Sequence, residues 1–159
     1  MRACCERTHR CRLMSDAARL IGAWRLRHWV ALAEDGSESQ PMGQEPDGLL
    51  VYSGDGTMIT VLGPSERPRF ESDDVTGGTD EERVRAFATY VAYGGSFTVD
   101  GDKVSHQVET SLFPNWIGTV QRRRWELDET GRRLTLTSPP VALGGATRIQ
   151  RLSWERVSR

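Results

Sequence analysis

A histidine, a glutamine and an arginine occur in two neighbouring segments of alternating polar and apolar residues, at spacings that place all three on the same face. His106 alternates with polar residues in step with Val104, and Gln121 and Arg123 alternate in step with Trp125. Because side chains of a strand point alternately to opposite faces, all three are predicted to face one interior. A histidine can move a proton near neutral pH, and an arginine with a glutamine can stabilise a developing oxyanion. These three residues are therefore the candidate catalytic group.

Each of the three also has a purely structural interpretation, and the sequence leaves both open. A buried histidine can be satisfied by neighbouring side chains, and Arg123 can pair with a glutamate of the sheet instead of a ligand carboxylate or enolate. If the protein is an enzyme, we expect an isomerase or cyclase acting on a biosynthetic intermediate, with His106 as acid and base. If it only binds, the same groups act passively. A third hypothesis is a structural domain that docks a partner protein.

Four further residues are predicted to contact a bound molecule: Tyr52, Tyr93, Trp116 and His28. Trp116 ends a Pro-Asn-Trp turn, which sets its ring at the rim of the interior. Tyr52 can orient a carbonyl group, and Tyr93 with Trp116 can form an apolar wall. His28 is in step with Trp24 and is predicted to face inward. A haem ligated by one histidine is an alternative that no motif supports, so we predict no cofactor and no metal.

The segments that carry these residues predict an all-β protein. Alternating or short apolar runs separated by glycine-containing turns indicate strands, and these strands are expected at 24–32, 48–52, 58–62, 96–99, 103–110, 119–127, 134–137 and 147–157. Eight such strands favour an antiparallel up-and-down β-barrel, because closure removes exposed edges. A short helix is predicted after Ser15.

One inserted helix is predicted to begin at Thr79, where Glu82 completes a capping box. Apolar residues at helical spacing follow from Val84, so the helix is expected to lie on the barrel. The pair Gly94-Gly95 is expected to end it.

The two ends of the predicted barrel carry a motif each. Gly22-Ala23-Trp24 opens the first strand and Trp154-Glu155-Arg156 closes the last, so Arg156 can lie across the indole of Trp24 as a cation–π contact. Together with the runs GLLVYSGDGTM, AYGGSFTVDG, SHQVETSLFPNWIGTVQRRRWEL and LSWER, this pattern resembles the bacterial and fungal lipocalin-like domain family of the calycin superfamily. The resemblance covers residues 18–157. It implies an eight-stranded barrel with a ligand cavity, and it implies no single reaction.

Length and composition set the remaining expectations. A chain of 159 residues suits one domain, and we expect a disordered N-terminal extension over 1–13 and the lipocalin-like β-barrel domain over 14–159. Because the net charge is −1, we do not expect the protein to bind nucleic acid. Because the sequence has no long apolar run, we do not expect membrane contact either. All three cysteines lie within the first eleven residues, so no disulfide is expected in the body. We predict that the protein is cytoplasmic and is a monomer or weak homodimer. Its expected partner is a small apolar ligand with a carbonyl or carboxylate.

Overall fold

A computed structural model describes residues 16–158 of the chain. Its strands are β1 (Gly22–Leu32), β2 (Glu38–Ser39), β3 (Pro46–Tyr52), β4 (Thr57–Pro64), β5 (Val91–Asp100), β6 (Lys103–Ser111), β7 (Val120–Leu127), β8 (Arg133–Leu143) and β9 (Ala146–Arg156). The helix α2 (Asp80–Ala88) precedes β5, and the 3-10 helix η1 (Pro114–Trp116) precedes β7. Residues 16–20 are helical, as predicted after Ser15.

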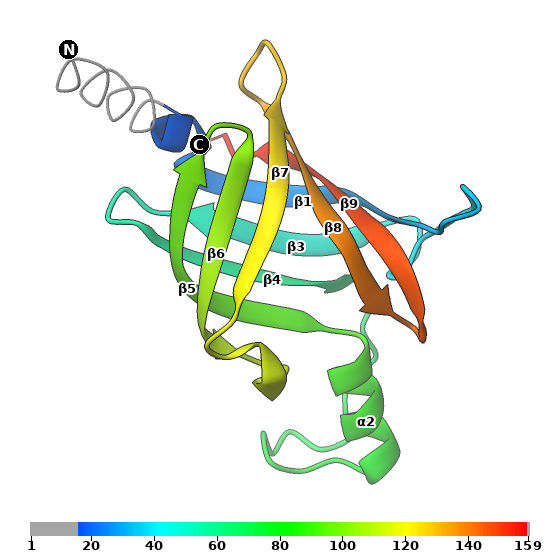
Figure 1. Cartoon of the computed structure of the whole chain (residues 1–159). Coiled ribbons are helices and arrows are strands. Elements are labelled where there is room, and N and C mark those ends of the chain that lie inside the picture. Colours follow the sequence, from blue (N-terminus) through cyan, green and yellow to red (C-terminus); the bar gives the residue numbers. More distant parts are fainter. Residues whose placement is uncertain (1–15, 159) are drawn as a thin grey trace, which may run out of the picture.

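Eight of these strands form a closed antiparallel barrel (Figure 1). Each strand from β3 to β8 pairs with the next along the chain, and β1 pairs with both β3 and β9, which closes the sheet. The predicted fold class is therefore confirmed. The additional strand β2 has two residues and pairs only with the far end of β1, where Ala31 lies opposite Ser39.

The chain reverses direction at the turns that the glycines predicted. Gly56 between β3 and β4 and Gly101 between β5 and β6 have positive φ angles of 89° and 58°, which only glycine adopts without strain. Short turns keep neighbouring strands in register, so alternate residues of each strand share one face. Val104, His106 and Val108 of β6 are accordingly all buried.

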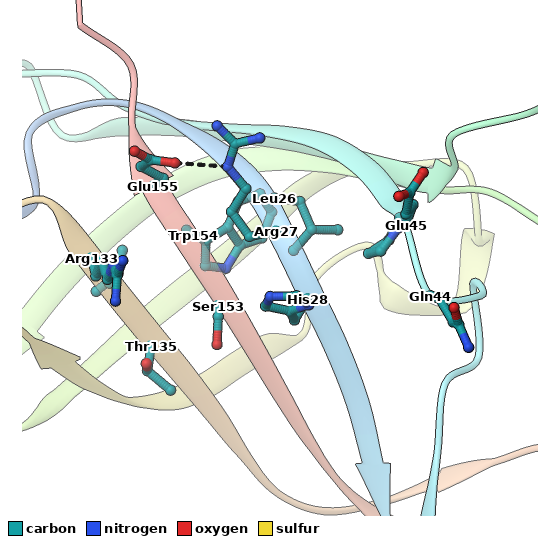
Figure 2. A pocket seen from close by; sticks show the side chains of 12 residues that line it. Leu26, Arg27, His28, Gln44, Glu45, Arg133, Thr135, Ser153, Trp154 and Glu155 are labelled. Carbon is teal, nitrogen blue, oxygen red and sulfur yellow. Dashed lines mark hydrogen bonds and ion pairs between the residues drawn. The ribbon is translucent and has the colours of Figure 1, made fainter.

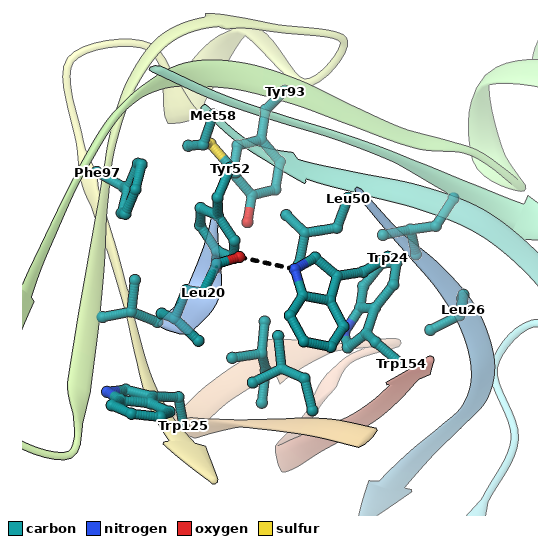
Figure 3. Close-up of a cluster of buried hydrophobic side chains, with 14 of the residues drawn as sticks. Leu20, Trp24, Leu26, Leu50, Tyr52, Met58, Tyr93, Phe97, Trp125 and Trp154 are labelled. Atoms are coloured by element: carbon teal, nitrogen blue, oxygen red, sulfur yellow. Dashed lines mark hydrogen bonds between the residues drawn. The ribbon is translucent and has the colours of Figure 1, made fainter. Parts of the chain in front are cut away.

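One end of the barrel is closed by a cluster that we call the floor: Leu20, Trp24 and Arg156. Figure 3 shows Leu20 and Trp24. The indole Nε1 of Trp24 donates to the backbone oxygen of Leu20 at 2.8 Å, and the guanidinium carbon of Arg156 lies 4.1 Å from the centre of the indole ring. Gly22 has a φ of 136°, which other residues rarely adopt, and a Cβ there would lie 2.8 Å from Nη1 of Arg156, so both features favour the glycine two residues before Trp24. The predicted cation–π contact is confirmed.

The helix α2 begins as predicted but lies elsewhere. Thr79 and Glu82 form the reciprocal capping box, with distances of 2.7 and 3.2 Å. The helix contains no buried residue, and Val84 and Phe87 are 67% and 48% exposed. The expectation that an apolar stripe packs on the barrel was wrong, because the helix projects from the open end (Figure 1).

Two strands are longer than their glycine and proline residues suggested. The pair Gly94-Gly95 does not end the helix but lies inside β5, where the register shifts and a side chain at Gly95 would collide with the backbone oxygen of Gln107. The strand β8 likewise continues through Pro140 to Leu143 by means of a register shift. Both are irregularities of a paired strand, the setting in which sheets tolerate glycine and proline.

Some expectations concern residues outside 16–158. The predicted extension over 1–13, with its three cysteines, lies beyond the described part of the chain. Within that part, no helix has both the length and the apolar character needed to span a membrane.

Candidate functional site

The barrel holds a cavity of about 480 Å³ whose lining includes Trp116 of η1. Its walls are the inward side chains of the strands, and most of them are apolar, such as Leu50, Leu62 and Leu136. Eight-stranded barrels of this kind have room for one small molecule. The cavity is therefore the candidate site.

Three polar side chains from three strands meet in a group that we call the tyrosine–histidine cluster: Tyr52 of β3, Tyr93 of β5 and His106 of β6. The Tyr52 hydroxyl lies 2.7 Å from His106 Nε2, and the Tyr93 hydroxyl lies 2.9 Å from His106 Nδ1. Tyr52 and His106 are each 1% exposed. Both ring nitrogens of His106 are thus occupied by phenols, so a metal or haem iron would have to displace one of them.

His106 is neutral at ordinary pH. Burial, and secondly the positive charge of Arg123, lower its pKa from 6.5 to about 3. Burial raises the pKa of Tyr52 and of Tyr93, so both phenols keep their protons as well. A neutral imidazole carries one N–H donor and one acceptor nitrogen.

Gln121 and Arg123 of β7 line the same cavity, as the alternation predicted. Gln121 lies opposite His106 in the β6–β7 register, and its Nε2 donates to the Thr119 hydroxyl at 3.3 Å. Arg123 donates to the backbone oxygen of Arg122 at 2.8 Å. Among residues 16–158 no carboxylate forms an ion pair with Arg123, so the predicted glutamate partner is not found there.

Trp116 stands at the rim. The helix η1 begins at Pro114 and carries Trp116 against Tyr93 and Phe113, with ring centres 5.5 and 5.7 Å apart and the rings nearly perpendicular. Edge-to-face packing of this kind fixes ring orientation. Trp116 is half-buried and lines the cavity, which leaves its ring available to a ligand.

His28 does not face the cavity, and this prediction was wrong. The register between β1 and β9 shifts between Leu26 and His28, because a β-bulge adds one residue to β1. The bulge turns His28 outward and turns Trp29, which is buried, inward. His28 lines a separate open pocket together with Arg27 and Glu155, which form an ion pair at 2.8 Å (Figure 2).

Several cavity residues were missed by the sequence reasoning. Three buried polar atoms have no hydrogen-bond partner among the described residues: Thr60 Oγ1, Gln150 Nε2 and Trp154 Nε1. All three residues line the cavity. Thr60 is in step with the apolar residues of β4, and Gln150 is in step with Trp154 on β9. The same alternation therefore would have predicted that both residues face inward. Trp29, whose Nε1 donates to Gln150 Oε1 at 2.7 Å, was hidden by the bulge.

The predicted site residues thus fall into three places. His106, Gln121, Arg123, Tyr93 and Trp116 line one cavity. Tyr52 contacts His106 without lining the cavity itself, and His28 lies outside. Catalytic or ligand-binding roles for the cavity residues stay predictions.

Comparison with known proteins gives two findings. Residues 21–157 match the family model described as a lipocalin-like domain. The chain is also 35% identical over 100 residues to a protein of Aspergillus oryzae named 4'-hydroxy-3'-methoxypropiophenone carrier protein, an alignment that covers 58% of this chain and 89% of that protein. Both findings fit a barrel that binds a small molecule.

Proposed function

The chain belongs to the lipocalin-like domain family, and on that premise we propose that it binds a small, largely apolar molecule bearing a carbonyl or carboxylate oxygen. The molecule occupies the barrel cavity, with its apolar part against the leucine and tryptophan side chains. Its oxygen accepts hydrogen bonds from the polar groups of the wall. In the simplest form of the proposal, the protein carries a biosynthetic intermediate.

One observation carries the proposal, namely three buried polar atoms without a partner on residues that line an apolar cavity. Two of the three, Gln150 Nε2 and Trp154 Nε1, are obligatory donors, and the third belongs to the Thr60 hydroxyl. A buried polar group without a partner costs about 1–3 kcal/mol. A bound acceptor oxygen would remove that cost, so the wall favours a ligand whose polar atoms accept.

Size and kinship support the same ligand class. A cavity of about 480 Å³ falls within the range of small-molecule sites. The Aspergillus oryzae relative is named as the carrier of a substituted propiophenone, an aryl ketone. An aromatic ketone combines an apolar body with one acceptor oxygen, and we propose this chemistry for the ligand here.

The test is a calorimetric titration of the protein with propiophenone. Leu152 lines the cavity, whereas Arg151, the preceding residue of β9, is exposed on the outer face. We expect Leu152→Trp to fill the cavity and weaken binding by at least about tenfold, and Arg151→Trp to leave it unchanged. Equal binding by both variants would show that the probe binds outside the cavity.

The competing hypothesis is an isomerase or cyclase of secondary metabolism that uses His106 as acid and base. A pKa near 3 leaves His106 a weak base at neutral pH, and both of its nitrogens are engaged by tyrosines. These facts support passive binding. If a reaction exists, His106→Gln would lower turnover far more than affinity, because the imidazole would act in the transition state. Binding with no turnover to lose is the expected result.

Other expectations from the sequence are kept as proposals. We propose a monomer or weak homodimer in the cytoplasm, with neither nucleic acid nor membrane as partner. Sedimentation of the full chain across a concentration range measures its assembly state, and a stable larger oligomer would contradict this proposal.

A further inference from the structure

We propose that Tyr52, His106 and Tyr93 form a hydrogen-bond relay with one fixed direction, which makes the Tyr93 hydroxyl the donor that selects a ligand with an acceptor oxygen. Tyr52 O–H donates to His106 Nε2, and His106 Nδ1–H donates to the Tyr93 oxygen. The Tyr93 hydrogen then remains for the ligand. The last step rests on the proposed function, whereas the direction of the relay does not.

The argument begins with a count of donors and acceptors. The neutral imidazole offers one N–H and one bare nitrogen, and each phenol offers one O–H. The two observed contacts, of 2.7 and 2.9 Å, therefore require one tyrosine to donate to the ring and the other to accept from it. Whichever tyrosine accepts is left with an O–H that needs a partner of its own.

The surroundings of the two phenols decide which tyrosine that is. Tyr52 is 1% exposed and is absent from the cavity lining, and among residues 16–158 its hydroxyl has no hydrogen-bond partner other than His106. If Tyr52 accepted from the ring, its own hydrogen would be buried without an acceptor, at a cost of about 1–3 kcal/mol. Tyr93 lines the cavity, where water or a ligand can accept. The lower-energy arrangement has Tyr52 donating.

The direction has a consequence for recognition. Tyr93 cannot accept a strong bond from a ligand while its oxygen receives Nδ1–H, so it faces the cavity as a donor. Its ring is held by the edge-to-face contact with Trp116, and its oxygen by the imidazole. A donor fixed in position loses little conformational entropy when it binds, which favours selectivity for a carbonyl oxygen at this point.

The first arm of the test needs no ligand. Long-range proton–nitrogen NMR correlation on the full chain with nitrogen-15-labelled histidine assigns the tautomer of His106. We expect the hydrogen on Nδ1 and a bare Nε2. A hydrogen on Nε2, or a doubly protonated ring at pH 7, would overturn the relay.

The second arm compares propiophenone with propylbenzene, which has the same carbon skeleton but no oxygen. We expect Tyr93→Phe to weaken propiophenone binding by about fivefold to tenfold, the effect of one net hydrogen bond, and to leave propylbenzene binding unchanged. Tyr90→Phe is the matched control, since it removes the phenol hydroxyl of a residue that stacks with Arg67 and does not line the cavity. Its effect on the preference for the ketone should be under about twofold.

The outcomes separate the two proposals. If Tyr93→Phe left the ketone preference unchanged, or if Tyr90→Phe reduced it equally, the Tyr93 hydroxyl would not select the ligand and the inference would be wrong. If neither probe bound, the proposed function would fail, and the tautomer would still decide the relay by itself.

Discussion

The floor and the cavity both contain tryptophan and polar side chains, but the polar atoms of the two regions differ in their hydrogen bonding. In the floor, Trp24 Nε1 is paired with Leu20, and the Arg156 guanidinium donates to backbone oxygens of Arg19, Ile21 and Gly131 at 2.7–2.9 Å. In the cavity, three buried polar atoms have no partner among the described residues. The floor is complete without a ligand, and the cavity is not.

The difference separates stability from function within one barrel. A polar group that is satisfied inside the protein contributes to folding, whereas an unsatisfied buried one lowers stability unless something binds it. We therefore expect substitutions in the floor to be destabilising, and some substitutions in the cavity to stabilise the protein while they impair binding.

Trp24→Ala should have the largest effect. The side chain is fully buried and packs against Leu20 and Arg156, so its loss should lower the free energy of unfolding by about 3–5 kcal/mol. Chemical denaturation measures this value. A loss below about 1 kcal/mol would mean that the floor does not hold the barrel together.

Arg156→Ala should follow, with a loss of about 2 kcal/mol, because three backbone oxygens lose a charged donor. Combined with Trp24→Ala in a double-mutant cycle, it should reveal a coupling of about 0.5–2 kcal/mol from the stacked pair. Strict additivity of the two losses would contradict the contact.

The pH dependence of stability should depend on the tyrosine–histidine cluster. Because the pKa of His106 is about 3 in the folded state and about 6.5 when unfolded, the unfolded chain binds the proton more readily. Stability is therefore full above pH 6.5 and is lost as the pH falls toward 3, by about 2 kcal/mol between pH 7 and pH 5.

Denaturation of His106→Gln at both pH values provides the control. Exposed carboxyls such as Asp55 and Asp128 have lowered pKa values, so they stay ionised from pH 7 to pH 5 and add little in this window. The variant should lose most of the pH dependence. An equal slope in both proteins would show that another group titrates.

Thr60→Val should have the smallest effect and the opposite sign. The substitution removes a buried hydroxyl without a partner and keeps a similar shape, so the free energy of unfolding should rise by about 1 kcal/mol. Thermal melting without ligand measures the change. A clear loss of stability would mean that the hydroxyl is satisfied and that the cavity resembles the floor.

The floor was predictable from sequence because strong local patterns lie at both ends of the barrel. Gly22 and Trp24 open β1, Arg156 closes β9, and closure of the sheet brings them together without further information. The alternation in β6 and β7 was regular, so His106, Gln121 and Arg123 could also be directed inward correctly.

Three-dimensional contacts that alternation does not encode were harder to predict. The hydrogen bond between His106 and Tyr52 joins residues 54 positions apart on strands that are not neighbours. It crosses the interior of the barrel, and strand pairing alone does not predict it. The position of helix α2 was predicted wrongly because its apolar residues suggested a packing face, although Val84 and Phe87 are 67% and 48% exposed. In both cases the missing information was tertiary.

The bulge in β1 has a consequence for comparing members of this family. It lies between Leu26 and His28, so it divides the strand into a floor segment with Trp24 and a cavity segment with Trp29. In a homologue that lacks the extra residue, the alternation would continue unbroken from the floor tryptophan. In an alignment without a gap, its inward residues would then stand at the positions of His28 and Val30. Alignments that contain no gap there would equate an inward residue with an outward one. When cavity residues are compared across the family to infer specificity, their positions should therefore be counted from the bulge, separately on each side of it.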